Sequence, residues 1–221
     1  MVKDIFTEND FQFPYTTIRF PGQASDERML YAGREASIML YIRLTFVVVA
    51  TLVLTGVSLG LLGVFGGFIG LAVGFLFPIA LLFGIVFGGV GLWWVSTIWK
   101  KSIFIITNRR LTKFIYVTPW NRYNLSVTLD MVEDTGAYSR GYFQALFHIG
   151  TLTARSAAGN REEKYFFVNN VERAEDLANY INKVLFTFKH DIAKLTTFRP
   201  FISAKSGQRD NLIKDHPEFT N

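Results

Sequence analysis

The residue pattern in this chain that most resembles a catalytic site is Gly56-Val57-Ser58-Leu59-Gly60, which has the G-x-S-x-G spacing of serine hydrolases. In those enzymes a turn between a strand and a helix presents the serine to a histidine base. Here the pattern lies within a long apolar run. The histidines of the chain are His148, His190 and His216, all far from it in the sequence. We therefore expect no catalytic role for this serine.

A second group of polar residues would suit an enzyme only if folding brought its members together. It consists of Asp130, Glu133, Asp134 and His148. Titratable groups that converge in a cleft are typical of catalytic sites, but these acids are more simply explained as solvated residues at strand ends. The sequence favours a protein that is not an enzyme.

The composition and motifs of the chain do not indicate a metal or cofactor site. The 221 residues include no cysteine, which excludes thiolate metal sites, disulfides and cysteine nucleophiles, and the three histidines are dispersed. The chain has no P-loop, dinucleotide-binding or zinc-protease motif. We predict no catalytic residue, no metal site and no cofactor.

The longest feature of the chain is an uncharged apolar stretch. Positions 44–99 contain no Asp, Glu, Lys, Arg or His. One crossing of a bilayer needs about 20 apolar residues, so this stretch predicts a transmembrane hairpin of two helices, at about 44–65 and 71–94. Adjacent glycines make helix continuation costly, so we expect the turn at Gly66-Gly67, and we expect Pro78 to kink the second helix.

Charges flanking this hairpin predict its orientation. Arg34 and Arg43 precede the first span, Lys100 and Lys101 follow the second, and the turn carries no charge. Basic residues beside membrane helices stay on the cytoplasmic side. We therefore expect a two-pass protein of the plasma membrane with both termini in the cytoplasm. The first forty residues lack an apolar core, so no cleavable signal peptide is expected.

Two further sets of residues in the hairpin have a predicted role. Rings with a polar edge prefer the headgroup level, and the predicted interface anchors are Tyr41, Trp93, Trp94 and Trp99. Small residues four apart let helices approach closely, and the pairs here are Gly56/Gly60, Gly70/Gly74 and Gly84/Gly88. Such glycines either join copies of the chain or pack the two helices of one hairpin together. Since no charged group lies within the membrane, the hairpin is predicted to be an anchor rather than a transport pathway.

After the hairpin, the hydrophobic period changes to two, which is typical of strands. Strands are predicted at 103–107, 111–117, 125–131, 143–147, 151–155 and 165–168. A helix is predicted over 174–188, where apolar residues repeat every three or four positions, with Asn169 or Asn170 as its N-cap. Short strands followed by one helix favour an antiparallel barrel or sandwich that the helix closes.

Two short motifs in this part of the chain resemble those of a known family. Ile106-Thr107-Asn108-Arg109-Arg110-Leu111 and Leu146-Phe147-His148-Ile149-Gly150-Thr151-Leu152 resemble elements of the bacterial pleckstrin-homology (PH) membrane proteins, formerly DUF304 and also called the YdbS-like group. In the second motif His148 stands where a glycine is usual. The segment from Phe20 to Arg34 resembles the family's leader, and the whole resemblance spans roughly residues 20–186.

This resemblance implies an α+β membrane protein of the bacterial plasma (inner) membrane. Its fold would be a transmembrane hairpin followed by a PH-like domain, a strongly bent seven-stranded antiparallel β-barrel capped by a C-terminal helix. The expected division is a leader at 1–43, the hairpin at 44–99, the PH-like domain at 100–188 and a polar tail at 189–221. Apolar residues near 195–202 allow the tail either to dock or to extend freely.

Eukaryotic PH domains often bind phosphoinositides through basic residues of their first hairpin. The corresponding basic residues in and before this hairpin are Lys100, Lys101, Arg109, Arg110 and Lys113. They either contact anionic lipid headgroups or serve only to set the topology.

Two functions remain open at this point. The first is a non-enzymatic, membrane-anchored PH-like interaction module at the cytoplasmic face, which binds another membrane or cytoplasmic protein, copies of itself or lipid headgroups. The second is a subunit of a membrane enzyme or transport complex whose site forms only in the assembly. Nucleic acid is not an expected partner, because the net charge of +5 arises from interleaved basic and acidic residues without a recognition motif.

Overall fold

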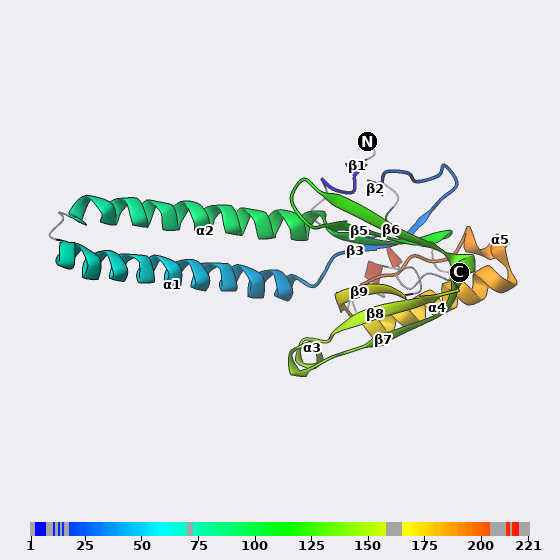
Figure 1. Cartoon of the computed structure of the whole chain (residues 1–221). Helices are drawn as coiled ribbons and strands as arrows, with labels where there is room; N and C mark the ends of the chain where they lie inside the picture. Colours follow the sequence, from blue (N-terminus) through cyan, green and yellow to red (C-terminus); the bar gives the residue numbers. More distant parts are fainter. Residues whose placement is uncertain are drawn as a thin grey trace. The chain divides into compact units, whose positions relative to one another are not determined.

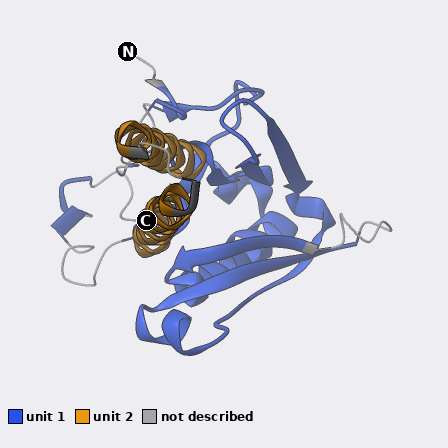
Figure 2. Ribbon diagram, turned by 60° about the vertical axis from the view of Figure 1, so that its left-hand side comes forward, with its two compact units in different colours: residues 1–36, 100–221 blue, residues 37–99 orange. Residues whose placement is uncertain are grey.

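The computed structural model describes residues 3–7, 11, 13, 15, 18–69, 73–157, 165–203, 211–212 and 214–216. The chain divides into two compact units (Figures 1 and 2). Unit 1 combines residues 1–36 with 100–221, and unit 2 consists of residues 37–99. The leader therefore belongs to the same unit as the strands that follow the hairpin, in contrast to the separate leader expected from the sequence.

Unit 2 is a hairpin of two long helices, α1 (Ser37–Ile69) and α2 (Leu76–Lys101), with a short 3-10 helix, η2 (Val73–Phe75), directly before α2. The last two residues of α2 already belong to unit 1. Mean hydropathy is 2.4 over Ser37–Gly67 and 2.1 over Leu76–Lys101, and neither window is buried within the protein. Both helices are long and apolar enough to cross a membrane.

The turn of the hairpin differs from the prediction. Gly66 and Gly67 lie inside α1, which continues to Ile69, and the second helix begins at Leu76 rather than at 71. In an apolar surrounding each backbone N–H and C=O needs a partner within the helix, and this requirement outweighs the roughly 1 kcal/mol that each glycine costs. Pro78 falls in the first turn of α2, where no intrahelical hydrogen bond needs its missing N–H, so the reason for the predicted kink disappears.

The glycines of the two helices have different surroundings. A Cβ added at Gly84 would overlap Oγ1 of Thr55, and one added at Gly88 would lie 3.1 Å from Cγ2 of Thr51, so these two glycines pack α2 against α1. A Cβ at Gly56 or at Gly60 would have no atom within 4 Å. Packing within the hairpin therefore explains the pair on α2, whereas self-association through the pair on α1 stays a prediction.

The third predicted glycine pair, Gly70/Gly74, does not lie on one described α-helix. Gly74 belongs to the 3-10 helix η2. Its predicted partner, Gly70, lies outside the described residues.

Unit 1 contains two antiparallel sheets. The first has the order β3-β4-β5-β6 and the second the order β7-β8-β9. The strands are β3 (Met29–Gly33), β4 (Ile103–Thr107), β5 (Arg110–Tyr116), β6 (Arg122–Thr128), β7 (Val132–Tyr138), β8 (Ile149–Ser156) and β9 (Tyr165–Glu172). In addition, β1 (Lys3–Asp4) pairs in parallel with β2 (Ile18–Arg19).

The two sheets do not join into the closed barrel that was expected. Within the described residues, β6 is not paired with β7, because the short 3-10 helix η3 (Leu129–Met131) carries the chain from one sheet to the other. This helix also ends the predicted alternation early, since Leu129 is fully buried whereas Met131 is 47% exposed. The result is two open antiparallel sheets around a shared core.

Strand β3 shows why the leader belongs to unit 1. It pairs antiparallel with β4, with Ala32 opposite Ile105, and places Leu30 in the core with no exposed surface. The two strands are separated by the whole hairpin in the sequence. Local periodicity gives no information on such a pairing, which depends on the tertiary structure.

A helix covers the second sheet. Helix α4 (Ala174–His190) packs against β7 and β8, and the short helix α5 (Ile192–Leu195) follows it. The predicted apolar stripe is confirmed: the buried residues of α4 are Ala174, Leu177, Ala178, Ile181, Val184 and Leu185. The predicted asparagine N-cap is wrong, because β9 extends to Glu172 and the capping position is Arg173, in left-handed conformation.

One predicted strand is a helix in the structure. Residues 143–147 lie largely in α3 (Tyr142–Leu146), which begins after Gly141 with its φ of +84°. Strand β7 was not predicted, although it pairs with β8 along its length. The apolar residues near 143 suggested a buried strand, but Tyr142 and Phe143 are 77% and 65% exposed.

Candidate functional site

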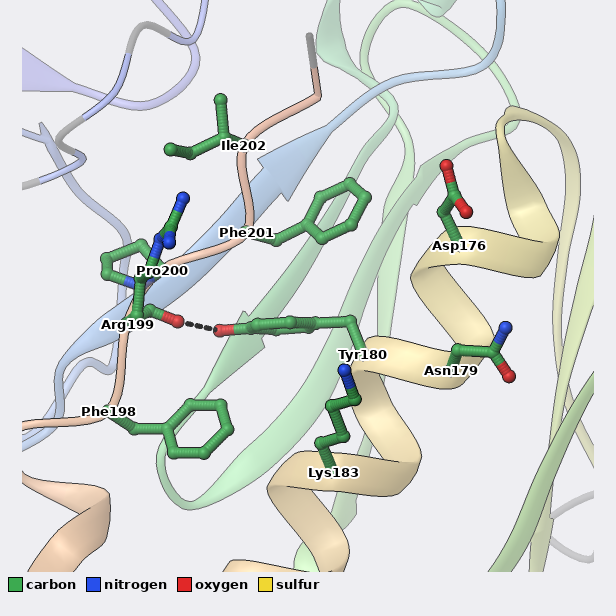
Figure 3. A pocket seen from close by; sticks show the side chains of 9 residues that line it. All are labelled: Asp176, Asn179, Tyr180, Lys183, Phe198, Arg199, Pro200, Phe201 and Ile202. Carbon is green, nitrogen blue, oxygen red and sulfur yellow. Dashed lines mark hydrogen bonds between the residues drawn. The ribbon is translucent and has the colours of Figure 1, made fainter. Parts of the chain in front are cut away.

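A groove of about 430 Å³ lies between α4 and the chain that follows α5 (Figure 3). The lining residues are Asp176, Asn179, Tyr180, Lys183, Phe198, Arg199, Pro200, Phe201 and Ile202. We call it the α4 groove. Its helix side carries polar and charged side chains around the ring of Tyr180, and its other side is formed by residues 198–202.

Tyr180 joins the two sides of the α4 groove. Its hydroxyl donates a hydrogen bond to the backbone oxygen of Arg199 over 2.6 Å, and its ring lies 5.2 Å from that of Phe201 and 5.8 Å from that of Phe198. Burial is the main reason why the pKa of Tyr180 lies far above its ordinary value of 10.0. The tyrosine is therefore neutral and remains a hydrogen-bond donor at physiological pH.

The segment after α5 is fixed against the edge of the first sheet. The N–H of Phe201 donates to the backbone oxygen of Leu30 in β3 over 2.8 Å, and the hydroxyl of Tyr15 donates to the oxygen of Phe201 over 3.1 Å. Phe201 and Ile202 are 6% and 4% exposed. Of the two alternatives for the tail, docking is correct for this part, which lies between a helix and an edge strand.

The basic turn between β4 and β5 is bound to the leader. The N–H of Arg28 donates to Oδ1 of Asn108 over 2.9 Å, and the N–H of Asn108 donates to the oxygen of Arg28 over 3.1 Å. Arg109 forms an ion pair with Asp26. The Thr-Asn-Arg-Arg motif thus connects the leader to the first sheet.

Arg110 binds a buried carboxylate in the same turn. Its Nε and Nη2 donate to Oε1 and Oε2 of Glu27, both over 2.9 Å. Burial by itself would raise the pKa of Glu27, but hydrogen bonds from Arg110, Thr107 and the N–H of Ala24 outweigh it and lower the pKa below its ordinary value. Arg110 is therefore engaged within unit 1.

Lys113, the third basic residue of this hairpin, bridges the two sheets. Its Nζ donates to the backbone oxygen of Phe167 in β9 over 3.0 Å. Burial lowers the pKa of Lys113, while the charge of Glu35 acts in the opposite direction. This geometry gives Lys113 a role in holding the sheets together.

The predicted lipid-contact residues therefore do not form one cluster. Strand β4 has five residues at about 3.3 Å each, which separates the turn at Arg109 from Lys101 by about 16 Å. Lys100 is exposed at the end of α2, and Nζ of Lys101 donates to the oxygen of Pro119 over 3.3 Å. Lipid contact stays a prediction, and it suits Lys100 and Lys101 better than the residues of the turn.

The predicted interface anchors lie on the two long helices. Tyr41 in α1 and Trp93 in α2 are 62% and 51% exposed, and Trp94 and Trp99 are partly buried. Ser58, the serine of the hydrolase-like pattern, donates to the backbone oxygen of Leu54 in its own helix over 2.7 Å. This is an ordinary hydrogen bond of a serine within a helix.

The polar residues of the enzyme alternative lie at opposite ends of the β7-β8 hairpin. Asp134 is opposite Arg155, near the end where Val132 faces Ser156, whereas His148 precedes β8 at the other end. Asp130 and Glu133, like Asp134, are exposed near the start of β7. The described residues contain no group of three or more His, Asp or Glu side chains that could hold a metal ion.

A second hollow, of about 400 Å³, lies beside the start of α4. His148 and Arg173 line it together with Glu175 and Asp176, so its charge is mixed. Both His148 and Arg173 have a positive φ, of 54° and 52°, and the N–H of Arg173 donates to the oxygen of His148 over 3.2 Å. A left-handed backbone favours glycine, which explains why a glycine is usual at position 148 in the family that the motif resembles.

Comparisons with known proteins give one structural match. No family model and no curated protein matches the chain. The chain is similar to the crystal structure of a DUF1696 family protein with a pleckstrin-homology domain from Shewanella loihica PV-4. The match has 19% sequence identity and a TM-score of 0.29, and it covers 40% of this chain and 70% of the other. At this level the likeness supports no statement about function.

Proposed function

We propose that this protein is a membrane-anchored interaction module. The α1-α2 hairpin tethers unit 1 to the bilayer, and the α4 groove binds an extended segment of a partner protein. The observation that carries this proposal is the path of residues 198–202, which lie between α4 and β3 and leave a groove of about 430 Å³ beside them.

The chemistry of the α4 groove suits a peptide. Extended peptides bind to sheet edges through backbone hydrogen bonds, and side-chain pockets supply their specificity. Here Phe201 already makes such a backbone bond to Leu30. Aromatic rings of Tyr180 and Phe198 offer an apolar surface, and Lys183 and Asp176 provide charges of both signs at the rim.

The membrane anchor rests on the two apolar helices and their flanking charges. Basic residues flank the hairpin at both of its ends in the sequence, Arg34 and Arg43 near the start of α1 and Lys100 and Lys101 at the end of α2. By the positive-inside rule they favour the cytoplasm for both termini. The two antiparallel sheets with a helix after the last strand support a PH-like domain. Membership of the bacterial PH family, the PH-like assignment and the absence of enzymatic activity are parts of this proposal.

Site-specific cross-linking in native membranes tests the binding of a partner. A photoreactive phenylalanine analogue at Asn179 or at Lys183 lies in the α4 groove, and the same analogue at the exposed Glu133 in β7 is the matched control. We expect one protein adduct of the same mass from both groove positions and none from Glu133.

The outcomes separate the two functions that the sequence left open. Adducts of equal yield from the groove and from Glu133 would contradict binding in the groove. An adduct with a subunit of a membrane enzyme or transporter would favour the role in a larger complex.

A further inference from the structure

The two chain connections between unit 1 and the hairpin leave unit 1 side by side. Residue 36 is the last of unit 1 before α1, and residue 100 is its first after the hairpin. Nε of Arg34 donates to the backbone oxygen of Lys100 over 2.8 Å. We call the edge of unit 1 that contains Ala36 and Lys100 the exit edge.

The β5-β6 hairpin turns at the exit edge. Strand β4 starts there at Ile103, the chain reverses at Asn108, and β5 returns antiparallel to β4. Lys101 fixes the following turn, because its Nζ donates to the oxygen of Pro119 over 3.3 Å and lies 5.4 Å from the ring centre of Tyr116. The exposed apolar side chains of this turn and its flanks are Val117 (56%), Trp120 (75%) and Tyr123 (53%).

Helix α3 lies at the same edge. Nε2 of Gln144 donates to Oδ1 of Asn170 over 2.9 Å, Nδ2 of Asn170 donates to Oε1 of Glu35 over 2.6 Å, and the N–H of Ala36 donates to the oxygen of Asn170 over 2.8 Å. Two hydrogen bonds thus connect α3 to the residue before the exit. The exposed apolar side chains around α3 are Tyr142 (77%), Phe143 (65%), Leu146 (53%) and Phe147 (43%).

Figure 1 shows both features at one end of unit 1, where the tip of the β5-β6 hairpin and α3 lie. Single exposed apolar residues are ordinary, whereas a group of them on one edge marks an interaction surface. Most members of this group are aromatic, and Trp and Tyr are the residues enriched at membrane–water interfaces.

Charge agrees with a lipid surface at the exit edge. Lys100 and Lys101 lie there, Arg122 starts β6 next to the turn, and Arg140 precedes α3. Each basic side chain near an anionic membrane adds favourable attraction. Of the acidic side chains, Glu35 lies at the exit edge, where its Oε1 accepts a hydrogen bond from Asn170, whereas Asp26 and Glu27 belong to the far end of β4.

We propose that the exit edge is a second membrane-contacting surface, in which the tip of the β5-β6 hairpin and α3 insert their aromatic side chains into the headgroup region of the bilayer. The inference rests on the proposed membrane anchor, because the surface begins one residue before α1. It holds unit 1 against the bilayer at two points besides the helices and leaves the α4 groove for a protein partner.

Single cysteines can test this in the full chain, because it contains no cysteine of its own. Trp120→Cys and Phe143→Cys carry an environment-sensitive fluorophore on the two tips. Phe87→Cys, at a 71% exposed position in the middle of α2, is the control for the anchor, and Ile192→Cys, 64% exposed in α5, is the control for the water-facing side. Each labelled protein is reconstituted into vesicles of phosphatidylethanolamine and phosphatidylglycerol, with and without a lipid that carries a quencher near its headgroup or in its acyl chain.

We expect the headgroup quencher to quench positions 120 and 143 several-fold more than position 192, and the acyl-chain quencher to quench position 87 most. If the fluorophore at position 87 is quenched and the one at position 120 or 143 is quenched no more than the one at position 192, the second surface is refuted while the anchor stands. Protection of 120 and 143 from an aqueous quencher without quenching by lipid would show a protein contact and would also overturn the proposal. If 87 is not quenched either, the anchor itself fails.

Discussion

Replacing Glu27 with glutamine tests whether the basic turn is a structural clamp on the leader. The carboxylate of Glu27 has 1% of its side-chain surface exposed, against 28% for Arg110. It accepts two hydrogen bonds of 2.9 Å from Arg110 and one of 2.8 Å from Thr107. Glu27→Gln removes the negative charge and leaves the guanidinium of Arg110 without its counter-charge.

The expected loss follows from the burial of this pair. Breaking a buried ion pair by removal of one partner costs about 3–5 kcal/mol. Because Arg110 keeps some access to solvent, we expect the lower end, about 3 kcal/mol. Asp26→Asn is the matched control one residue away. The Asp26–Arg109 pair is 61% and 53% exposed, and exposed pairs contribute less than about 1 kcal/mol.

Urea unfolding of the full chain in detergent micelles, followed by pulse proteolysis of unit 1, measures both variants. Glu27→Gln should lower the free energy of unfolding by several times the change caused by Asp26→Asn. Equal effects of the two substitutions would refute the assignment of the clamp to the buried pair. A fragment limited to residues 100–188 is unsuitable for this test, since it lacks β3 and the segment that docks on it.

The same pair predicts a dependence on pH. The pKa of Glu27 is lower in the folded protein than its ordinary value of 4.5. Its contribution to stability is therefore fully present above that value and is lost as the pH falls through the lowered pKa of the folded state. The Glu27→Gln variant should lack this loss in the acid range, whereas a wild-type curve without it would contradict the argument.

Two further predictions concern the hairpin and the α4 groove. Gly84→Leu should destabilise the hairpin by about 1–3 kcal/mol through overpacking against Thr55, whereas Gly56→Leu should not. Thermal denaturation in detergent measures both variants, and similar losses of stability would contradict the packing assigned to α2. Tyr180→Phe leaves the partly buried oxygen of Arg199 without its donor and should cost about 1 kcal/mol, seen as faster hydrogen exchange in residues 198–203. Unchanged hydrogen exchange in the variant would contradict the docking. Because the pKa of Tyr180 is raised, its contribution to stability is present below pH 10.0 and is lost as the pH rises further.

Several elements could be predicted from local sequence because a local pattern causes them. The uncharged stretch at 44–99 predicts two long apolar helices, and the three- and four-residue repeat predicts α4 and its buried face. Strand β4 coincides with the predicted 103–107, since five consecutive apolar or β-branched residues form a fully buried strand. For these elements the side chains of one segment suffice to determine its conformation.

Segments where solvent and distant strands compete with the local pattern were predicted wrongly. The apolar residues near Phe143 suggested a buried strand, but they form a short exposed helix, because no described element of unit 1 covers them. For Arg109 and Arg110 the sequence left lipid contact or a role in topology open, and it did not reveal that the leader supplies a carboxylate to each. The five residues of β4 separate this turn from Lys101 within unit 1.

The sequence by itself determined that the chain has two helices able to cross a membrane, strands after them and one amphipathic helix. Each of these follows from the period and length of apolar runs. Only the tertiary structure decided that the leader supplies β3, that the sheets stay open, and that Phe201 docks beside Tyr180 to form the α4 groove. It also brought Trp120 and Phe143 to the exit edge. These features depend on pairing between segments separated by most of the chain, and no local pattern carries that information.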